Sequence, residues 1–126
     1  MKKPQTIKIP IDLYNLDISL LVGGERKELQ EIIDKWSGHD KNIIPTKAKG
    51  WTGRIDGYGY VMWLEKWPNN PETYSYLAHE AFHATDFILE DIEAPLVHET
   101  EEVYAYLVGY IVHEILKRKP NKKTTR

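Results

Sequence analysis

The strongest constraint on the fold is a helix whose start and end are both marked in the sequence. Asn70 is a favourable N-cap, Pro71 suits the first helical position, and the next proline downstream is Pro95. Because a proline disfavours helical backbone in the residue before it, the helix must end before that point. These signals predict a helix over residues 71–91, and its middle carries the segment HEAFH at residues 79–83.

The rest of the chain divides into shorter strands and helices. Partial alternation of Ile, Leu and Val marks the strands, apolar residues three and four apart mark the helices, and glycine and proline among polar residues mark the loops. The predicted elements are one or two strands over 6–22, a strand over 55–65, helices over 25–36 and 101–119, and a loop over 37–54 that has room for a short strand. Thr100 is the predicted N-cap of the last helix. This order predicts an α+β fold, in which a short mixed sheet packs against helix 71–91 and the C-terminal helix.

Length and charge limit the class of protein. The chain has 126 residues, which fits one domain, and we place that domain at residues 1–119. Its net charge is −2, yet residues 117–126 hold six basic residues and no acid, so the remainder carries −8. An acidic body argues against nucleic-acid binding. Residues 120–126 are predicted to be a basic, disordered tail, with a tether to an acidic partner as the alternative.

The lack of cysteine limits the possible metal ligands, and the lack of a recognisable signal peptide or membrane span bears on where the protein is expected to be located. The chain contains no cysteine, so a metal would have to be held by His, Asp or Glu. The N-terminal residues lack the unbroken apolar run of a signal peptide, and no stretch approaches the roughly 18 apolar residues of a membrane span. The expectation is a cytoplasmic protein that does not bind membranes.

The HEAFH segment carries the residue types of a metal site. His79 and His83 project from one helix face a turn apart, so both rings can converge on one ion, and zinc takes tetrahedral nitrogen and oxygen ligands at about 2 Å. Glu80 lies about 100° round the helix, too far to be a ligand but within reach of a water on the metal. Asp86 and Glu90 continue the histidine stripe, either as partners of an imidazole N–H or as a solvated face. The pattern predicts one Zn2+ with Glu80 as general base.

HEAFH on a helix that follows an aromatic strand resembles the active-site helix of zincin metallopeptidases. The metzincin branch continues as HExxHxxGxxH, and it is excluded because Asp86 and Leu89 stand at the last two positions. Gluzincins place a glutamate ligand on a following helix, some eighteen to twenty residues beyond the second histidine. Glu102 follows His83 by nineteen residues and begins an E-x-x-A pattern. The overall layout is also similar to that of short metallopeptidase-like proteins of phages and prophages.

Two neighbouring glutamates compete for the role of third ligand. Glu101 projects closer to the apolar stripe of the last helix, where a carboxylate is costly unless it binds something. Glu102 has the gluzincin-like spacing and the E-x-x-A pattern. The resemblance therefore implies Glu102 as the ligand, with Glu101 as the alternative.

The resemblance also implies an activity, namely hydrolysis of a peptide bond in a protein or peptide substrate. Zinc would polarise the carbonyl and lower the pKa of its water towards about 7, and Glu80 would pass the proton to the leaving amine. The resemblance also suggests a Tyr or His near the ligand helix as oxyanion donor; the candidates are Tyr106, Tyr110, His113 and His98, although each taken alone fits a structural role better than a catalytic one. The strand at 58–64 either would be the sheet edge on which the substrate pairs or is an ordinary packed strand that meets no substrate. One alternative function is a zinc site that serves structure or partner binding without turnover. Another is a regulatory or structural protein of the phage type in which the motif is accidental or degenerate.

Overall fold

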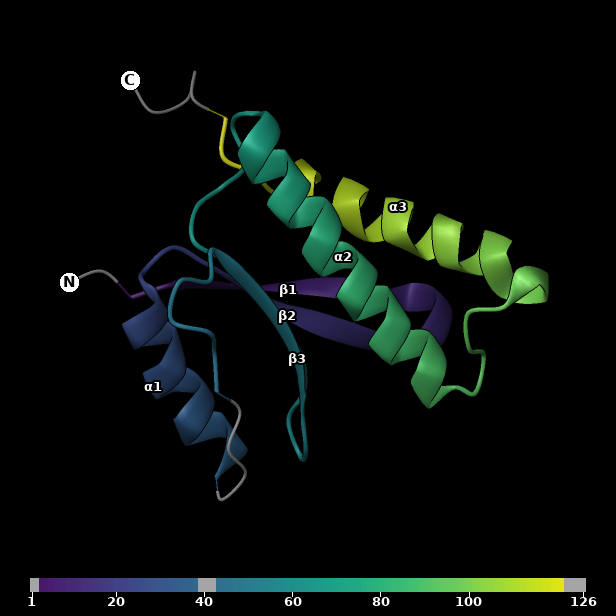
Figure 1. Ribbon diagram of the computed structural model, residues 1–126, viewed down its shortest axis with the longest axis horizontal. Helices are drawn as coiled ribbons and strands as arrows, with labels where there is room; N and C mark the ends of the chain where they lie inside the picture. Colours follow the sequence, from purple (N-terminus) through teal and green to yellow (C-terminus); the bar gives the residue numbers. More distant parts are fainter. Residues whose placement is uncertain (1–2, 39–42, 122–126) are drawn as a thin grey trace.

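The computed structural model describes residues 3–38 and 43–121 and confirms the α+β fold (Figure 1). One mixed sheet has the strand order β1-β2-β4-β3, in which β2 and β4 are parallel and the outer pairs are antiparallel. The elements are β1 (Gln5–Ile11), the 3₁₀ turn η1 (Asp12–Tyr14), β2 (Leu16–Val22), α1 (Arg26–Ser37), β3 (Gly50–Ile55), β4 (Gly59–Leu64), α2 (Pro71–Asp91), the 3₁₀ turn η2 (His98–Thr100) and α3 (Glu101–Lys117).

Alternating side chains of the central strands divide the apolar core between the two faces of the sheet. Leu20 and Met62 face α2 and α3, whereas their neighbours Leu21 and Trp63 face α1. All four are fully buried, which explains why β2 and β4 are apolar on both faces. The helix pair α2–α3 and helix α1 therefore cover opposite faces of one sheet.

The strand predicted over residues 55–65 contains a turn near its start, so that Ile55 ends one strand and Gly59 begins the next. Gly57 and Gly59 have φ values of +79° and +127°, which L-residues rarely adopt, and the chain reverses between Ile55 and Gly59. The segment before the turn becomes β3, the short strand allowed for within residues 37–54. The segment after it becomes β4. The hairpin places β3 at the edge of the sheet and β4 inside it.

Helix α2 has the predicted bounds and the predicted cap. The side chain of Asn70 accepts a hydrogen bond from the Thr73 N–H at 2.9 Å, and the Asn70 N–H reaches the Thr73 hydroxyl at 3.1 Å. This reciprocal pairing satisfies two donors that a helix start leaves free. Buried residues that include Leu77 and Ile88 then seat the helix on the sheet.

Helix α3 has the predicted N-cap residue, Thr100, and ends at Lys117, two residues early. The side chain of Thr100 makes no capping hydrogen bond, because its hydroxyl accepts from the Val97 N–H at 3.0 Å and donates to the Pro95 carbonyl at 2.6 Å. Of the predicted tail, residues 122–126 lie outside the described residues. In the described part of the chain, no helix combines the length and apolarity needed to cross a membrane.

Candidate metal and catalytic site

The two histidines of HEAFH meet on the exposed surface of α2. Their Nε2 atoms lie 3.1 Å apart, and the ring centroids are 4.6 Å apart with the planes at 76°. The helix alone produces this approach, because residues four apart are stacked on one face. The structure therefore brings together the two ligands predicted from the sequence, His79 and His83.

The separation of the two Nε2 atoms suits a shared ion. Two nitrogens bound to a tetrahedral ion at about 2.0–2.1 Å stand about 3.3 Å apart. The observed 3.1 Å is close to that value. It is equally suitable for one N–H···N hydrogen bond between neutral imidazoles. The donor chemistry and spacing of His79 and His83 thus fit zinc, although they do not require it.

Glu80 is held against the edge strand of the sheet. It is only 7% exposed, and its Oε1 accepts a hydrogen bond of 2.7 Å from the hydroxyl of Thr52 on β3. The same hydroxyl lies 3.2 Å from the Glu80 carbonyl oxygen. A Cβ at Gly50 would lie 3.1 Å from Glu80 Cγ and 3.2 Å from Oε2, so the bare glycine backbone allows this close packing. The carboxylate of Glu80 is therefore fixed in place beside the histidine pair.

Thr52 and Gly50 were missed by sequence reasoning. They are two residues apart on β3 and so share the face that meets α2. The available signal was this alternation, but Gly50 and Gly53 weakened it and made the segment resemble a loop.

An open cleft of about 300 Å³ extends over the histidine pair. Residues from α2, from β3 and from the segment before β3 form its walls. They are Pro45, Gly50, Trp51, Thr52, His79, Glu80, His83 and Phe87. Beyond Phe87, the Arg54 guanidinium lies over the ring at 4.9 Å from its centroid and pairs with Asp91 at 2.5 Å. The cleft therefore combines an apolar wall with the side chains of His79, Glu80 and His83.

The structure does not add the predicted third ligand to this group. Glu101 and Glu102 are exposed in the first turn of α3. Among residues 3–38 and 43–121, no three His, Asp or Glu side chains are grouped so that they could hold a metal ion. The assignment of Glu102, or of Glu101, remains a prediction from the sequence.

The edge strand next to the cleft is β3, not the strand that was expected. The strand at 58–64 corresponds to β4, whose two sides are already paired with β2 and β3. It has no free backbone donors or acceptors along its length for a substrate, so that prediction is wrong. The outer side of β3 is the exposed sheet edge on this side of the molecule.

No protein-family model, curated protein or solved structure matches the chain.

The remaining predicted site residues make other contacts. Asp86 accepts a hydrogen bond of 3.2 Å from Tyr104 of α3, and burial together with this bond raises the pKa of Tyr104. Tyr106 is 62% exposed and stacks on Tyr110, with ring centroids 6.3 Å apart. These two tyrosines line a separate hollow with Ile11, Asp12 and Leu13. Asp86 thus joins α2 to α3, and the two tyrosines lie outside the cleft over the histidine pair.

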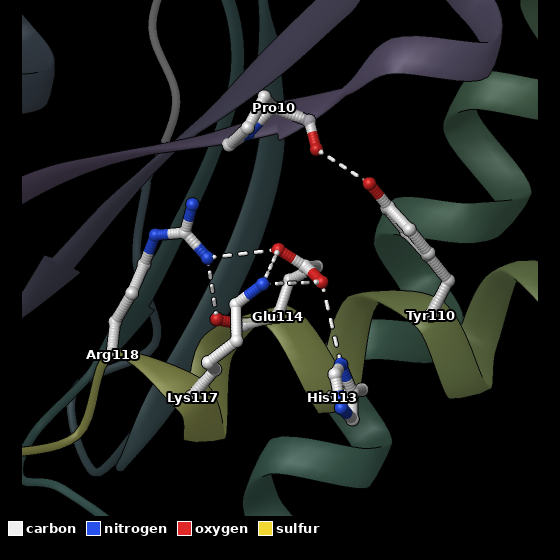
Figure 2. Close-up of polar contacts among 6 residues, drawn as sticks. All are labelled: Pro10, Tyr110, His113, Glu114, Lys117 and Arg118. Atoms are coloured by element: carbon white, nitrogen blue, oxygen red, sulfur yellow. Dashed lines mark hydrogen bonds and ion pairs between the residues drawn. The ribbon is translucent and has the colours of Figure 1, made fainter.

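His113 belongs to an ion cluster at the end of α3 (Figure 2). Glu114 is buried there and accepts from Arg118 at 3.0 Å, from Lys117 at 3.3 Å and from His113 Nδ1 at 3.3 Å. The hydrogen bond from Arg118, followed by those from Lys117 and His113, lowers the pKa of Glu114 to about 2. Tyr110 donates to the Pro10 carbonyl at 3.3 Å. These contacts stabilise the end of α3 and bind the helix to β1.

His98 is exposed in η2 and does not line the cleft.

Proposed function

We propose that the chain binds one zinc ion through His79 and His83 and hydrolyses a peptide bond with Glu80 as general base. The observation that carries the proposal is the meeting of the two Nε2 atoms at 3.1 Å beside a carboxylate held by Thr52. A bound zinc ion would polarise the scissile carbonyl and acidify a water molecule. The protein would hold the ion with its two histidines and place the carboxylate of Glu80 beside it.

Glu80 is prepared for the proton transfer by its contact with β3. The Thr52 hydroxyl occupies Oε1, and among the described residues no other hydrogen bond engages the carboxylate. Oε2 is thus the oxygen that takes the proton from water and passes it to the leaving amine. Fixing one oxygen keeps the other in position, which lowers the entropic cost of reaching the transition state.

The surroundings of the cleft favour an extended peptide as substrate. The free edge of β3 offers backbone donors and acceptors with which a peptide can pair as an added strand. The rings of Trp51 and Phe87 and the ring of Pro45 line the same cleft. They favour an apolar side chain on the substrate near the bond to be cut.

A zinc site without turnover is the second candidate, and two observations favour it. Glu80 is 7% exposed, which limits how freely a water can reach its carboxylate. In addition, the described residues provide no group of three protein ligands, as a catalytic zinc site usually has. In that case the two histidines would bind the metal to stabilise α2 or to recruit a partner.

Metal analysis of protein purified without added zinc tests the proposal. The wild type should carry one zinc per chain, His83→Ala should lose it, and Glu80→Gln should retain it, because Glu80 is not a ligand. His113→Ala is the matched control, since it removes an exposed histidine from α3. Zinc-free wild-type protein would exclude both functions.

Turnover separates the two candidates. Zinc-loaded wild type and Glu80→Gln should be incubated with a mixed peptide library, and the fragments identified by mass spectrometry. Cleavage by the wild type that Glu80→Gln lacks supports the peptidase. Zinc binding without cleavage in either protein supports the binding role.

A further inference from the structure

We infer that this chain holds its metal by a two-histidine chelate, and that neither Glu101 nor Glu102 is a ligand. The inference rests on the proposed metal site at His79 and His83 and defines its coordination. Among residues 3–38 and 43–121 no third His, Asp or Glu joins the pair, so within this part of the chain the remaining coordination positions would take water or a donor from a bound molecule.

The direction of α3 places both glutamates away from the histidines. After the connecting loop, α3 runs back alongside α2, so that the start of α3 lies near the end of α2 (Figure 1). Tyr104 of α3 meets α2 at Asp86, with 3.2 Å between the hydroxyl and Oδ1, and its ring centroid is 6.5 Å from that of Phe82. Residues before Tyr104 consequently lie beside the part of α2 that follows Asp86. His79 and His83 lie in the opposite direction along α2.

Two aromatic rings line the junction of α2 and α3 next to His83. The ring of Phe82 lies 6.2 Å from that of His83 and 6.5 Å from that of Tyr104. Tyr104 is only 3% exposed, so the part of α3 next to these rings is held by packing. Glu101 lies one helical turn before Tyr104, in the direction along α2 that leads away from the histidines.

The packing of α3 prevents it from sliding towards the histidines. Leu107, Ile111 and Ile115 are buried in the main core. The hydroxyl of Tyr110 is bonded to the Pro10 carbonyl, at 3.3 Å. Moving a glutamate one helical turn along α2 means a shift of about 5.4 Å, which would empty these core positions.

A two-histidine chelate has a consequence for metal choice. A third protein ligand would impose a tetrahedral geometry and so favour zinc, whereas two imidazoles with open positions impose little geometry. Affinity should then follow the intrinsic order for nitrogen ligands, in which Ni2+ and Cu2+ bind more tightly than Zn2+. Metal bound this way should also be accessible to small ligands from solution.

The test is a metal titration of the full-length, metal-free protein with Zn2+ and with Ni2+, in competition with a chromophoric chelator. The variants are His83→Ala, Glu101→Gln, Glu102→Gln and the double variant Glu101→Gln/Glu102→Gln. Glu99→Gln is the matched control, because it is another exposed glutamate beside the same turn. Circular dichroism checks that each variant is folded.

Wild-type affinity should be retained within about twofold in all the glutamine variants and lost in His83→Ala. Removing even a group that only hydrogen-bonds to a ligand costs about 10–100-fold in metal affinity. A loss of about tenfold or more in Glu101→Gln or Glu102→Gln would therefore overturn the inference and leave the proposed function standing. Absence of zinc binding in the wild type would overturn both.

Cobalt substitution provides an independent measurement. Co2+ bound by two histidines and water should give the weak visible absorption of a six-coordinate ion. An intense four-coordinate spectrum that weakens in the double glutamine variant would contradict the two-histidine chelate.

Discussion

Thr52→Val removes the hydroxyl that donates to Glu80 Oε1 at 2.7 Å and keeps the branched shape of the side chain. Glu80 as a residue is 7% exposed, so its carboxylate loses its hydrogen bond within a largely buried side chain. A buried acceptor left without a partner costs about 1–3 kcal/mol. We therefore expect the free energy of unfolding to fall by about 2 kcal/mol.

The decrease in Tm expected for Thr52→Val can be calculated from the length of the chain. With about 2.1 cal/mol/K of unfolding entropy per residue, a domain of 126 residues shifts by about 4 °C per kcal/mol. Thr52→Val should thus lower Tm by about 8 °C, measured by circular dichroism in the presence of a chelator. The chelator matters because metal that binds only the folded state would add its own stabilisation.

A double-mutant cycle assigns the loss to the contact between Thr52 and Glu80. In a Glu80→Met background the acceptor is gone, so Thr52→Val should cost little, and the coupling should be about 1–2 kcal/mol. Thr46→Val makes the same chemical change in an exposed loop residue and should stay within about 0.5 kcal/mol of the wild type. An equal cost of Thr52→Val in both backgrounds would show that the hydroxyl does not act on Glu80, and the account of how Glu80 is positioned would fail.

The remaining predictions concern the rest of the fold. Because the folded-state pKa of Glu114 is lowered from 4.5 to about 2, its ion pairs stabilise the fold fully above pH 4.5 and lose this effect as the pH falls towards 2. Glu114→Gln should therefore lower Tm at neutral pH, and its difference from the wild type should narrow between those values; a constant difference would contradict this. A Cβ at Gly53 would lie 2.1 Å from Cη2 of Trp51, so Gly53→Ala should cost about 1–3 kcal/mol in urea unfolding. That cost should vanish in a Trp51→Ala background, and if it persists the clash is not its source. Burial, and then the hydrogen bond to Asp91, raise the pKa of Tyr60 to about 12, so Asp91→Asn should lower that pKa in a spectrophotometric titration, and an unchanged titration would argue against the contact.

The sequence was sufficient to predict those features that depend only on residues a few positions apart in the chain. The start of α2 at Asn70 and Pro71 depends on hydrogen bonds within four residues, and the predicted bounds are those observed. The meeting of His79 and His83 likewise follows from the helical repeat, whatever packs around it. For the same reason the order of helices and strands was enough to predict the α+β class.

Elements defined by distant contacts were harder to predict. Residues 50–55 resemble a loop because Gly50 and Gly53 interrupt the apolar alternation. They form a strand because β4 supplies its hydrogen-bond partners, and because Glu80 occupies the space that a side chain at Gly50 would fill. Thr100 is the predicted N-cap residue of α3, but its hydroxyl makes no capping hydrogen bond because it bonds to the Pro95 carbonyl in the preceding loop.

The sequence by itself determined that helix α2 presents His79 and His83 on one face, with Glu80 about 100° round the helix. Helical geometry repeats every few residues, so a short motif is enough to specify it. Only the tertiary structure decided which strand borders the site, that Thr52 holds Glu80, and that Tyr104 of α3 meets α2 at Asp86. A spacing of nineteen residues along the chain cannot specify how two helices align, because that alignment is set by the packing of buried side chains between them.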